Sequence, residues 1–283
     1  MSDSRSGTAV SGEDAPKKSI TFLNAARHYE VLKAADVDYP LSAMILAQTD
    51  RGELTFYTGI STGPGSVKLE PIPGSTQKES AAFYTDLFQK SHTVILPDSM
   101  FTAESMLLDT DTFVSEGLCP LQEFFRGGGK VVVVCVEGIY AIGDVLSSSF
   151  GSNWRLGQIT DHDSIVTERG RNLLGSRVNA PKVHLRKGHF METPANDGIY
   201  GIFTPDFEAY LEENYGGDAD EEDREDAKQS WKRQASLNQS NFAIAIHKDT
   251  ESQGNLVWFG DRSMKSELIP VFAMLLRPEI RIE

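Results

Sequence analysis

The residues best suited to chemistry are a cysteine and a carboxylate that follow a run of four valines. Cys135 comes directly after Val131–Val134, and Glu137 lies two residues further on. A thiolate is a nucleophile, and a carboxylate close to it is able to carry a proton. These residue types predict attack of Cys135 on a carbonyl or a similar electrophile, with Glu137 or a distant histidine as the proton carrier.

The elements expected to position this cysteine are a buried strand and a helix. Four valines without polar alternation are typical of a strand covered on both faces, such as a central parallel strand. Residues 138–146 carry apolar side chains at helical spacing. Cys135 should therefore lie in a strand-to-helix turn, where the helix N-terminus favours a thiolate and its N–H groups could hold an oxyanion. The alternative is that Cys135 is a small apolar core residue.

Other strand ends add carboxylates to the same predicted edge of the sheet. A strand at Thr93–Leu96 should end near Asp98, and a strand at Asn255–Phe259 should end near Asp261. Because ligands of open α/β sheets bind outside the carboxyl ends of the strands, we expect a crevice there. We expect no histidine within hydrogen-bond reach of Cys135, and a carboxylate, Glu137 or Asp261, as its nearest titratable group. The candidate catalytic residues are Cys135 and Glu137, and the candidate ligand-binding residues are Asp98, Asp261, Gly138 and Tyr140.

Composition limits the partners. The 283-residue chain has a formal net charge of −14, which argues against nucleic acid and anionic membranes, because both require a cationic surface. A small molecule or a protein is the predicted partner, and a homo-oligomer remains open. The chain has two cysteines and no apolar run of the ~20 residues that span a bilayer. We therefore predict a cytoplasmic protein with no membrane association.

Neither a metal nor a cofactor is predicted. His184, His189 and Glu192 suggest a metal site at first sight, but the spacing of the two histidines puts them on opposite faces of a continuous strand. The segment Gly59–Ser66 matches neither a P-loop nor a dinucleotide fingerprint and is predicted to be a loop. Gly127–Gly129 precedes its strand, whereas phosphate-binding loops follow theirs.

The chain is predicted to be one α/β domain over residues 19–283, after a disordered tail at residues 1–18. A less regular insertion is expected at about 152–240. The acidic segment Glu212–Asp226 leads into a helix predicted from Asp220 to about Ala235. This segment is either a solvated face or a docking site for a basic partner.

Three segments together resemble the class I glutamine amidotransferase-like superfamily, which includes DJ-1/PfpI-like and ThuA-like proteins. They are Val94–Asp98, Phe124–Cys135 and Gly254–Asp261, the last followed by a helix. The resemblance implies a flavodoxin-like, mostly parallel sheet with helices on both faces and a C-terminal β-hairpin plus helix. It also implies that Cys135 stands at the nucleophile position.

The motif departs from the catalytic pattern of that superfamily. Catalytic members flank the cysteine with small residues and carry a His-Pro-Glu after the last strand, whereas here Val134 and Val136 flank Cys135 and no histidine stands near Asp261. His247, one strand earlier, is a possible substitute. The predicted function is therefore binding of a small molecule or a protein without glutaminase activity. The alternative is a cysteine-nucleophile enzyme of hydrolase, amidase or lyase type that uses Cys135.

Overall fold

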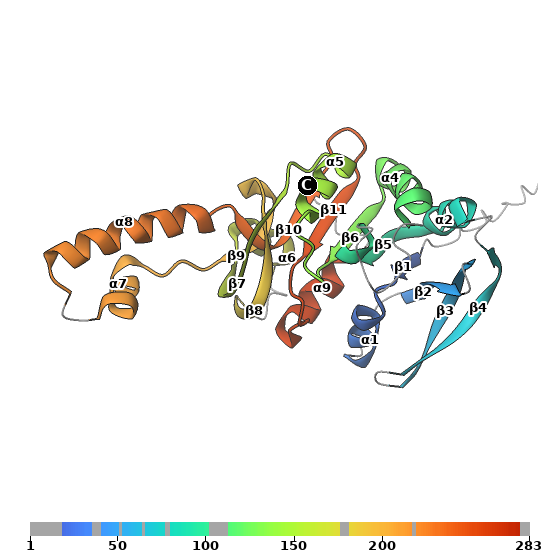
Figure 1. Ribbon diagram of the computed structural model, residues 1–283, viewed down its shortest axis with the longest axis horizontal. Helices are drawn as coiled ribbons and strands as arrows, with labels where there is room; N and C mark the ends of the chain where they lie inside the picture. Colours follow the sequence, from blue (N-terminus) through green and yellow to red (C-terminus); the bar gives the residue numbers. More distant parts are fainter. Residues whose placement is uncertain are drawn as a thin grey trace, which may run out of the picture.

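The computed structural model describes residues 19–35, 41–50, 53–63, 66–76, 80–101, 113–175, 181–216 and 219–277. Eleven strands form a single sheet in the order β4-β3-β2-β1-β5-β6-β11-β10-β8-β7-β9 (Figure 1). Five neighbouring strands at its centre run parallel to one another. They are β2 (Leu41–Asp50), β1 (Ser19–Leu23), β5 (Ser91–Pro97), β6 (Lys130–Val134) and β11 (Asn255–Phe259).

Antiparallel strands extend this centre on both sides. On one side β3 (Glu53–Gly63) and β4 (Ser66–Thr76) follow β2, and β4 is the edge strand. On the other side, four strands close into a small barrel, because β9 pairs with β10 as well as with β7. These barrel strands are β10 (Asn241–Lys248), β8 (Lys182–Glu192), β7 (Arg155–Val166) and β9 (Gly198–Ile202).

The prediction of a flavodoxin-like, mostly parallel sheet is wrong, because most neighbouring strands are antiparallel and four of them form the barrel. The error comes largely from the segment predicted to be an irregular insertion. Its strands β7 and β8 pair along most of their length, but register shifts interrupt the pairing near Ile159 and His162. Such irregularities break the period-two pattern by which strands are recognised in a sequence.

A second difference concerns β3 and β4. The segment predicted to be a loop, Gly59–Ser66, ends β3 and begins β4, while residues 64–65 lie outside the described ranges. Pro71 and Pro73 lie within β4. Proline has no N–H group to donate to a neighbouring strand. It is therefore tolerated in an edge strand such as β4, which has a neighbouring strand on one side only.

Helices cover both faces of the parallel centre, and β6 shows why. Val132 and Val134 belong to a cluster with α1 (Ala26–Ala34) and α9 (Ile269–Leu275). Val131, Val133 and Cys135 belong to a second cluster with α2 (Ser80–Gln89), α4 (Leu118–Arg126) and α5 (Ile142–Phe150). Every residue of β6 is buried, which confirms the prediction of a strand covered on both faces.

A helical arm, α7 (Phe207–Tyr215) and α8 (Glu221–Asn238), projects from the barrel, and the β3–β4 hairpin lies at the opposite end of the molecule (Figure 1). The Asp220 side chain caps α8 by accepting from the N–H groups of Glu222 and Asp223, as the predicted start of this helix requires. Within the described ranges, no helix combines the length and the apolar composition that crossing a bilayer requires. The predicted tail at residues 1–18 lies outside these ranges.

The remaining helical segments are short connections. One of them, α6 (Glu168–Leu174), follows β7 directly and is capped by Thr167, whose side chain accepts from the N–H of Gly170. The others are η2 (Asp98–Phe101), η3 (Phe113–Gly117), η5 (Ala195–Asp197) and η6 (Ser266–Leu268).

Candidate functional site

The turn that follows β6, residues 135–141, is held by the carboxylate of Asp98. Asp98 is fully buried and lies directly after β5, beside the end of β6. Its two oxygens accept five backbone N–H groups, four of them from the Cys135 turn. The donors are Ser99 at 3.1 Å, Val136 at 2.9 Å and Glu137 at 3.1 Å to Oδ1, and Gly138 at 2.6 Å and Ile139 at 3.1 Å to Oδ2.

This arrangement changes what the turn is able to do. The helix predicted to start at Gly138 starts instead at Ile142, so residues 136–139 belong to the turn before α5. Their N–H groups are the ones that we predicted could hold an oxyanion. Because these groups already donate to a buried carboxylate, the anion that occupies the site is Asp98 itself.

Cys135 is part of the core at this point. Its side chain is fully buried in the cluster that contains Ile142 and Leu146. Burial raises the pKa of the Cys135 thiol, the charges of Asp98 and Asp261 raise it further, and Arg262 and the N–H of Gly138 oppose them. The net direction is strongly upward, so the thiol is neutral at physiological pH.

Asp98, rather than Glu137 or Asp261, exerts the largest effect of any charged group on the pKa of Cys135. Asp261 lies after β11, as predicted, but it is buried and bonds its own turn. Its carboxylate accepts from the N–H and hydroxyl of Ser263, at 3.0 and 2.7 Å, and from the N–H of Lys265. Asp98 and Asp261 thus order two adjacent loops at this edge of the sheet.

Other groups at this edge are wholly or partly accessible to solvent. Tyr140 is 82% exposed, Glu137 is partly buried and Arg262 is exposed. Of the residues predicted to bind a ligand, Tyr140 is therefore available to a partner, whereas Asp98 and Asp261 are occupied. Gly138 has a φ of +77°, which favours glycine at this position.

One residue at this edge was not expected from the sequence. His189 of β8 is buried against the Cys135 turn, where a Cβ on Gly138 would overlap its imidazole. Burial lowers the pKa of His189, although the charge of Asp98 opposes this, and its Nδ1 atom has no hydrogen-bond partner among the described residues. A positive φ at Lys187 interrupts the alternation of β8, so four consecutive residues from Gly188 are buried. No hydrogen bond joins Cys135 Sγ to an imidazole in the described part of the chain.

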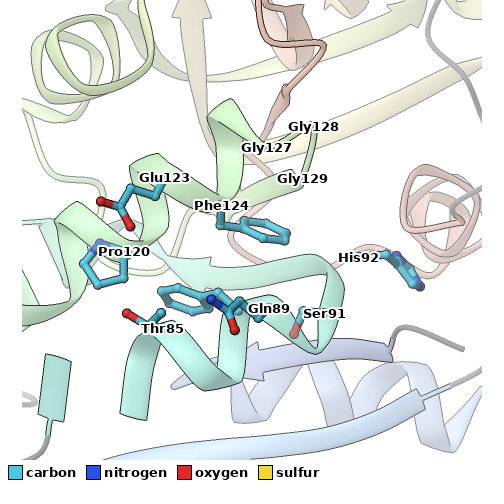
Figure 2. A pocket seen from close by; sticks show the side chains of 11 residues that line it. Thr85, Gln89, Ser91, His92, Pro120, Glu123, Phe124, Gly127, Gly128 and Gly129 are labelled. Atoms are coloured by element: carbon cyan, nitrogen blue, oxygen red, sulfur yellow. The ribbon is translucent and has the colours of Figure 1, made fainter. Parts of the chain in front are cut away.

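A cavity of about 410 Å³ lies at the other end of the same parallel strands (Figure 2). It is bounded by α2 and α4, by Ser91 and His92 at the start of β5, and by Gly127–Gly129 before β6. We call it the amino-end pocket. It is separate from the Cys135 turn, because β5 and β6 are parallel and the turn follows their carboxyl ends.

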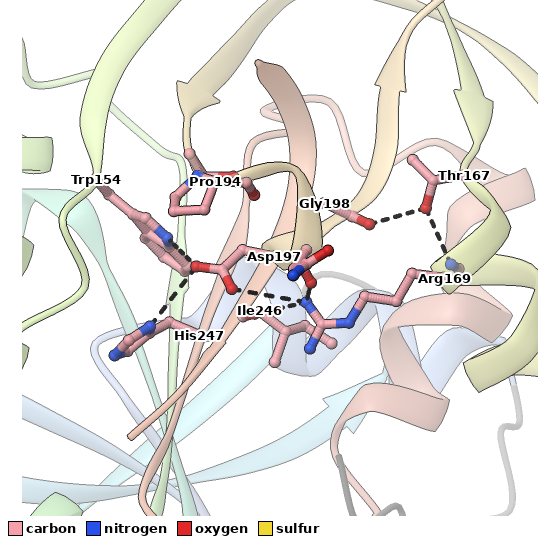
Figure 3. Close-up of polar contacts among 11 residues, drawn as sticks. Trp154, Thr167, Arg169, Pro194, Asp197, Gly198, Ile246 and His247 are labelled. Atoms are coloured by element: carbon pink, nitrogen blue, oxygen red, sulfur yellow. Dashed lines mark hydrogen bonds and ion pairs between the residues drawn. The ribbon is translucent and has the colours of Figure 1, made fainter. Parts of the chain in front are cut away.

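His247, the possible substitute base, belongs to a polar cluster on the barrel (Figure 3). Its Nδ1 lies 3.6 Å from the carboxylate of Asp197, which also accepts from Trp154 Nε1 at 2.8 Å and lies 3.8 Å from the guanidinium of Arg169. Arg169 donates in turn to the carbonyl oxygens of Asn196 and Ile246. These contacts join η5, α6 and β10, so the cluster stabilises the barrel rather than serving Cys135.

The histidines considered for a metal site do not form one. His184 is exposed and its Nδ1 lies 2.9 Å from Asp163, whereas His189 is buried. Across the described ranges, no group of three His, Cys, Asp or Glu side chains is placed to hold a metal ion. In comparisons with known proteins, no family model and no curated protein matches this chain.

Proposed function

We propose that this protein binds a small molecule or a protein partner and has no glutaminase activity. The observation that supports this most strongly is the occupation of the Cys135 turn by Asp98, which accepts the N–H groups of residues 136–139. A glutaminase stabilises a tetrahedral oxyanion with such donors. The proposal treats the domain as a divergent relative of the class I amidotransferase-like proteins, with Cys135 retained at the nucleophile position.

The electrostatics of the turn support the same proposal. A cysteine nucleophile acts as the thiolate, and enzymes lower its pKa with a helix N-terminus or a neighbouring cation. Here the burial of the thiol and the charges of Asp98 and Asp261 raise that pKa instead. Arg262 is the cation that acts against them, and it is outweighed.

The binding part of the proposal places the partner over the exposed groups of this edge. Tyr140 projects its ring into solvent from the Cys135 turn, and Arg262 is exposed on the neighbouring loop. Tyrosine and arginine are the residue types that most often dominate binding interfaces. The buried carboxylates of Asp98 and Asp261 fix the loops that present them, so these contact groups are held in place before a partner arrives.

The test is ammonia release from glutamine by the wild-type protein and by Cys135→Ala, each compared with a buffer blank. We expect both proteins to match the blank, since the thiol is neutral and its oxyanion donors are occupied. Ammonia release by the wild-type protein that Cys135→Ala abolishes would contradict the proposal. Cys119→Ala is the matched control, because Cys119 is the exposed cysteine.

A second candidate function is an enzyme that uses Cys135 as its nucleophile, and one observation favours it. The buried imidazole of His189 lies against Gly138, and its Nδ1 has no hydrogen-bond partner among the described residues, so a base is available near the turn if the loop rearranges. The expected signature is modification of Cys135 by a carbonyl electrophile at neutral pH that is lost in His189→Ala. A Cys135 that stays unmodified in both proteins removes this candidate.

A further inference from the structure

The amino-end pocket is lined by a partly exposed aromatic ring and a carboxylate. The ring belongs to Phe124 of α4, and it packs against the buried ring of Phe88 of α2, with centroids 6.0 Å apart and planes tilted by 40°. Figure 2 shows Glu123 and Phe124 on one side of the pocket and Thr85 and Gln89 on the other. None of the 11 lining residues is a lysine or an arginine, and Glu123 is the only carboxylate among them.

Two helix C-termini meet at this pocket, since α2 ends at Gln89 and α4 ends at Arg126. The carbonyl oxygens at a helix C-terminus carry a partial negative charge, which favours a cation nearby. Lys90, the basic residue next to α2, is held 2.5 Å from Asp86 on the helix surface. Glu123 is therefore the charged group of the lining that favours a cation, whereas Arg126 and the glycine N–H groups that bond the last carbonyl oxygens of α4 reduce the contribution of that helix end.

The glycine turn makes room for this arrangement. A Cβ on Gly129 would overlap the ring of Phe124, so only glycine lets that ring pack against the start of β6. The N–H groups of Gly127, Gly128 and Gly129 bond the last carbonyl oxygens of α4, at 2.9 to 3.0 Å. These N–H groups are thus turned toward α4, and the turn offers no anion-binding donors to the pocket.

We propose that the amino-end pocket binds a small organic cation, namely an amine or quaternary ammonium group on a compact apolar body. The partly exposed ring of Phe124 attracts such a cation through its electron-rich face, and Glu123 supplies the countercharge. A volume of about 410 Å³ fits a small-molecule site. The net charge of −14 adds a favourable long-range field for a cation. This proposal goes beyond the proposed function, because it assigns a ligand class to a second site, at the opposite ends of the parallel strands from Cys135.

The probe is choline, compared with 3,3-dimethyl-1-butanol, its uncharged analogue of the same shape. Binding is followed by the amide NMR shifts of Gly127, Gly128 and Gly129 at low ionic strength. We expect choline to shift these resonances saturably and the neutral analogue to bind about tenfold more weakly, because only the charge differs. Equal binding of both probes, or no saturable shift with choline at tens of millimolar, would overturn the proposal.

Three exposed-site variants complete the experiment. Glu123→Gln should weaken choline binding about fivefold or more, and Gln89→Lys should abolish it by placing a cation at the rim. Glu168→Gln, on the remote helix α6, should bind choline as the wild type does. Choline binding unchanged by Glu123→Gln would also overturn the proposal. The glutaminase assay tests the Cys135 turn, at the other end of the parallel strands. If choline does not bind, the proposal of an organic cation in the amino-end pocket is wrong, but the proposal about Cys135 is unaffected.

Discussion

Asp98 is the residue on which the Cys135 turn depends. Asp98→Asn would place an amide NH₂ where two backbone N–H groups now donate to a carboxylate oxygen, so donors would face donors. Because the site is buried, we expect a loss of about 3 kcal/mol in the free energy of unfolding, measured by urea denaturation.

The matched control for this substitution is Asp144→Asn, because Asp144 is exposed in the first turn of α5. It should cost no more than about 1 kcal/mol, the usual effect of a carboxylate at a helix N-terminus. Asp98→Asn with wild-type stability would show that this carboxylate does not hold the turn.

His28 should make the protein sensitive to acid. Its imidazole is buried on α1 with neither ring nitrogen hydrogen-bonded among the described residues, and burial, aided by Arg27, lowers its pKa to about 4. Above pH 6.5 the ring is neutral in both folded and unfolded chains. As the pH falls from 6.5 toward 4, only the unfolded chain takes up this proton, so about 3 kcal/mol of stability should be lost.

The test of this acid sensitivity is the urea midpoint between pH 7 and pH 4. His28→Leu should flatten the decline and stabilise the protein at pH 5, because the ring contacts apolar Phe272. His184→Leu, at an exposed imidazole, should leave the decline nearly as it is. A decline that persists in full in His28→Leu would assign the acid sensitivity to other groups.

Among the elements, helix α8 is much less buried than the central strands of the sheet. Of its 18 residues only Ala227 and Asn238 are buried, and a contact between Phe207 and Trp231 joins it to α7. A helix that is polar on all sides gains little from packing. We expect the amides of residues 224–234 to exchange with solvent at much lower opening free energies than those of β5, β6 and β11, measured by native-state hydrogen exchange. Equal protection of α8 and β6 would mean that the arm unfolds only with the core.

The elements also differ in how well they could be predicted from the sequence. The valines of β6 and the position of Cys135 after them were predictable, because both faces of that strand are covered and no polar residue interrupts it. The barrel was not predictable, because the pairing of β7 with β8 contains register shifts and the alternation of buried and exposed residues in β8 is interrupted at Lys187. For this reason the approach of His189 to Gly138 could not be predicted from the spacing of histidines. The hydrogen bonds of Asp98 are likewise tertiary, spanning about forty residues of chain.

At the scale of the whole molecule, the parallel centre presents two distinct edges. Its carboxyl edge holds the Cys135 turn, which is closed by Asp98 and bordered by exposed Tyr140. Its amino edge holds the pocket between α2 and α4. The amino-end pocket thus lies away from the thiol, and our central claim is that Cys135 at the carboxyl edge is held neutral in the core.

Counting alkylated cysteines in the native protein tests this claim most directly, because the chain has two cysteines and only one of them is exposed. After treatment with iodoacetamide at pH 7.5, intact-mass spectrometry should show one adduct, mapped to Cys119, and two adducts once the protein is unfolded in guanidinium. We expect this result because burial and the neighbouring carboxylates keep the Cys135 thiol neutral. Rapid labelling of Cys135 in the native protein at that pH would contradict it.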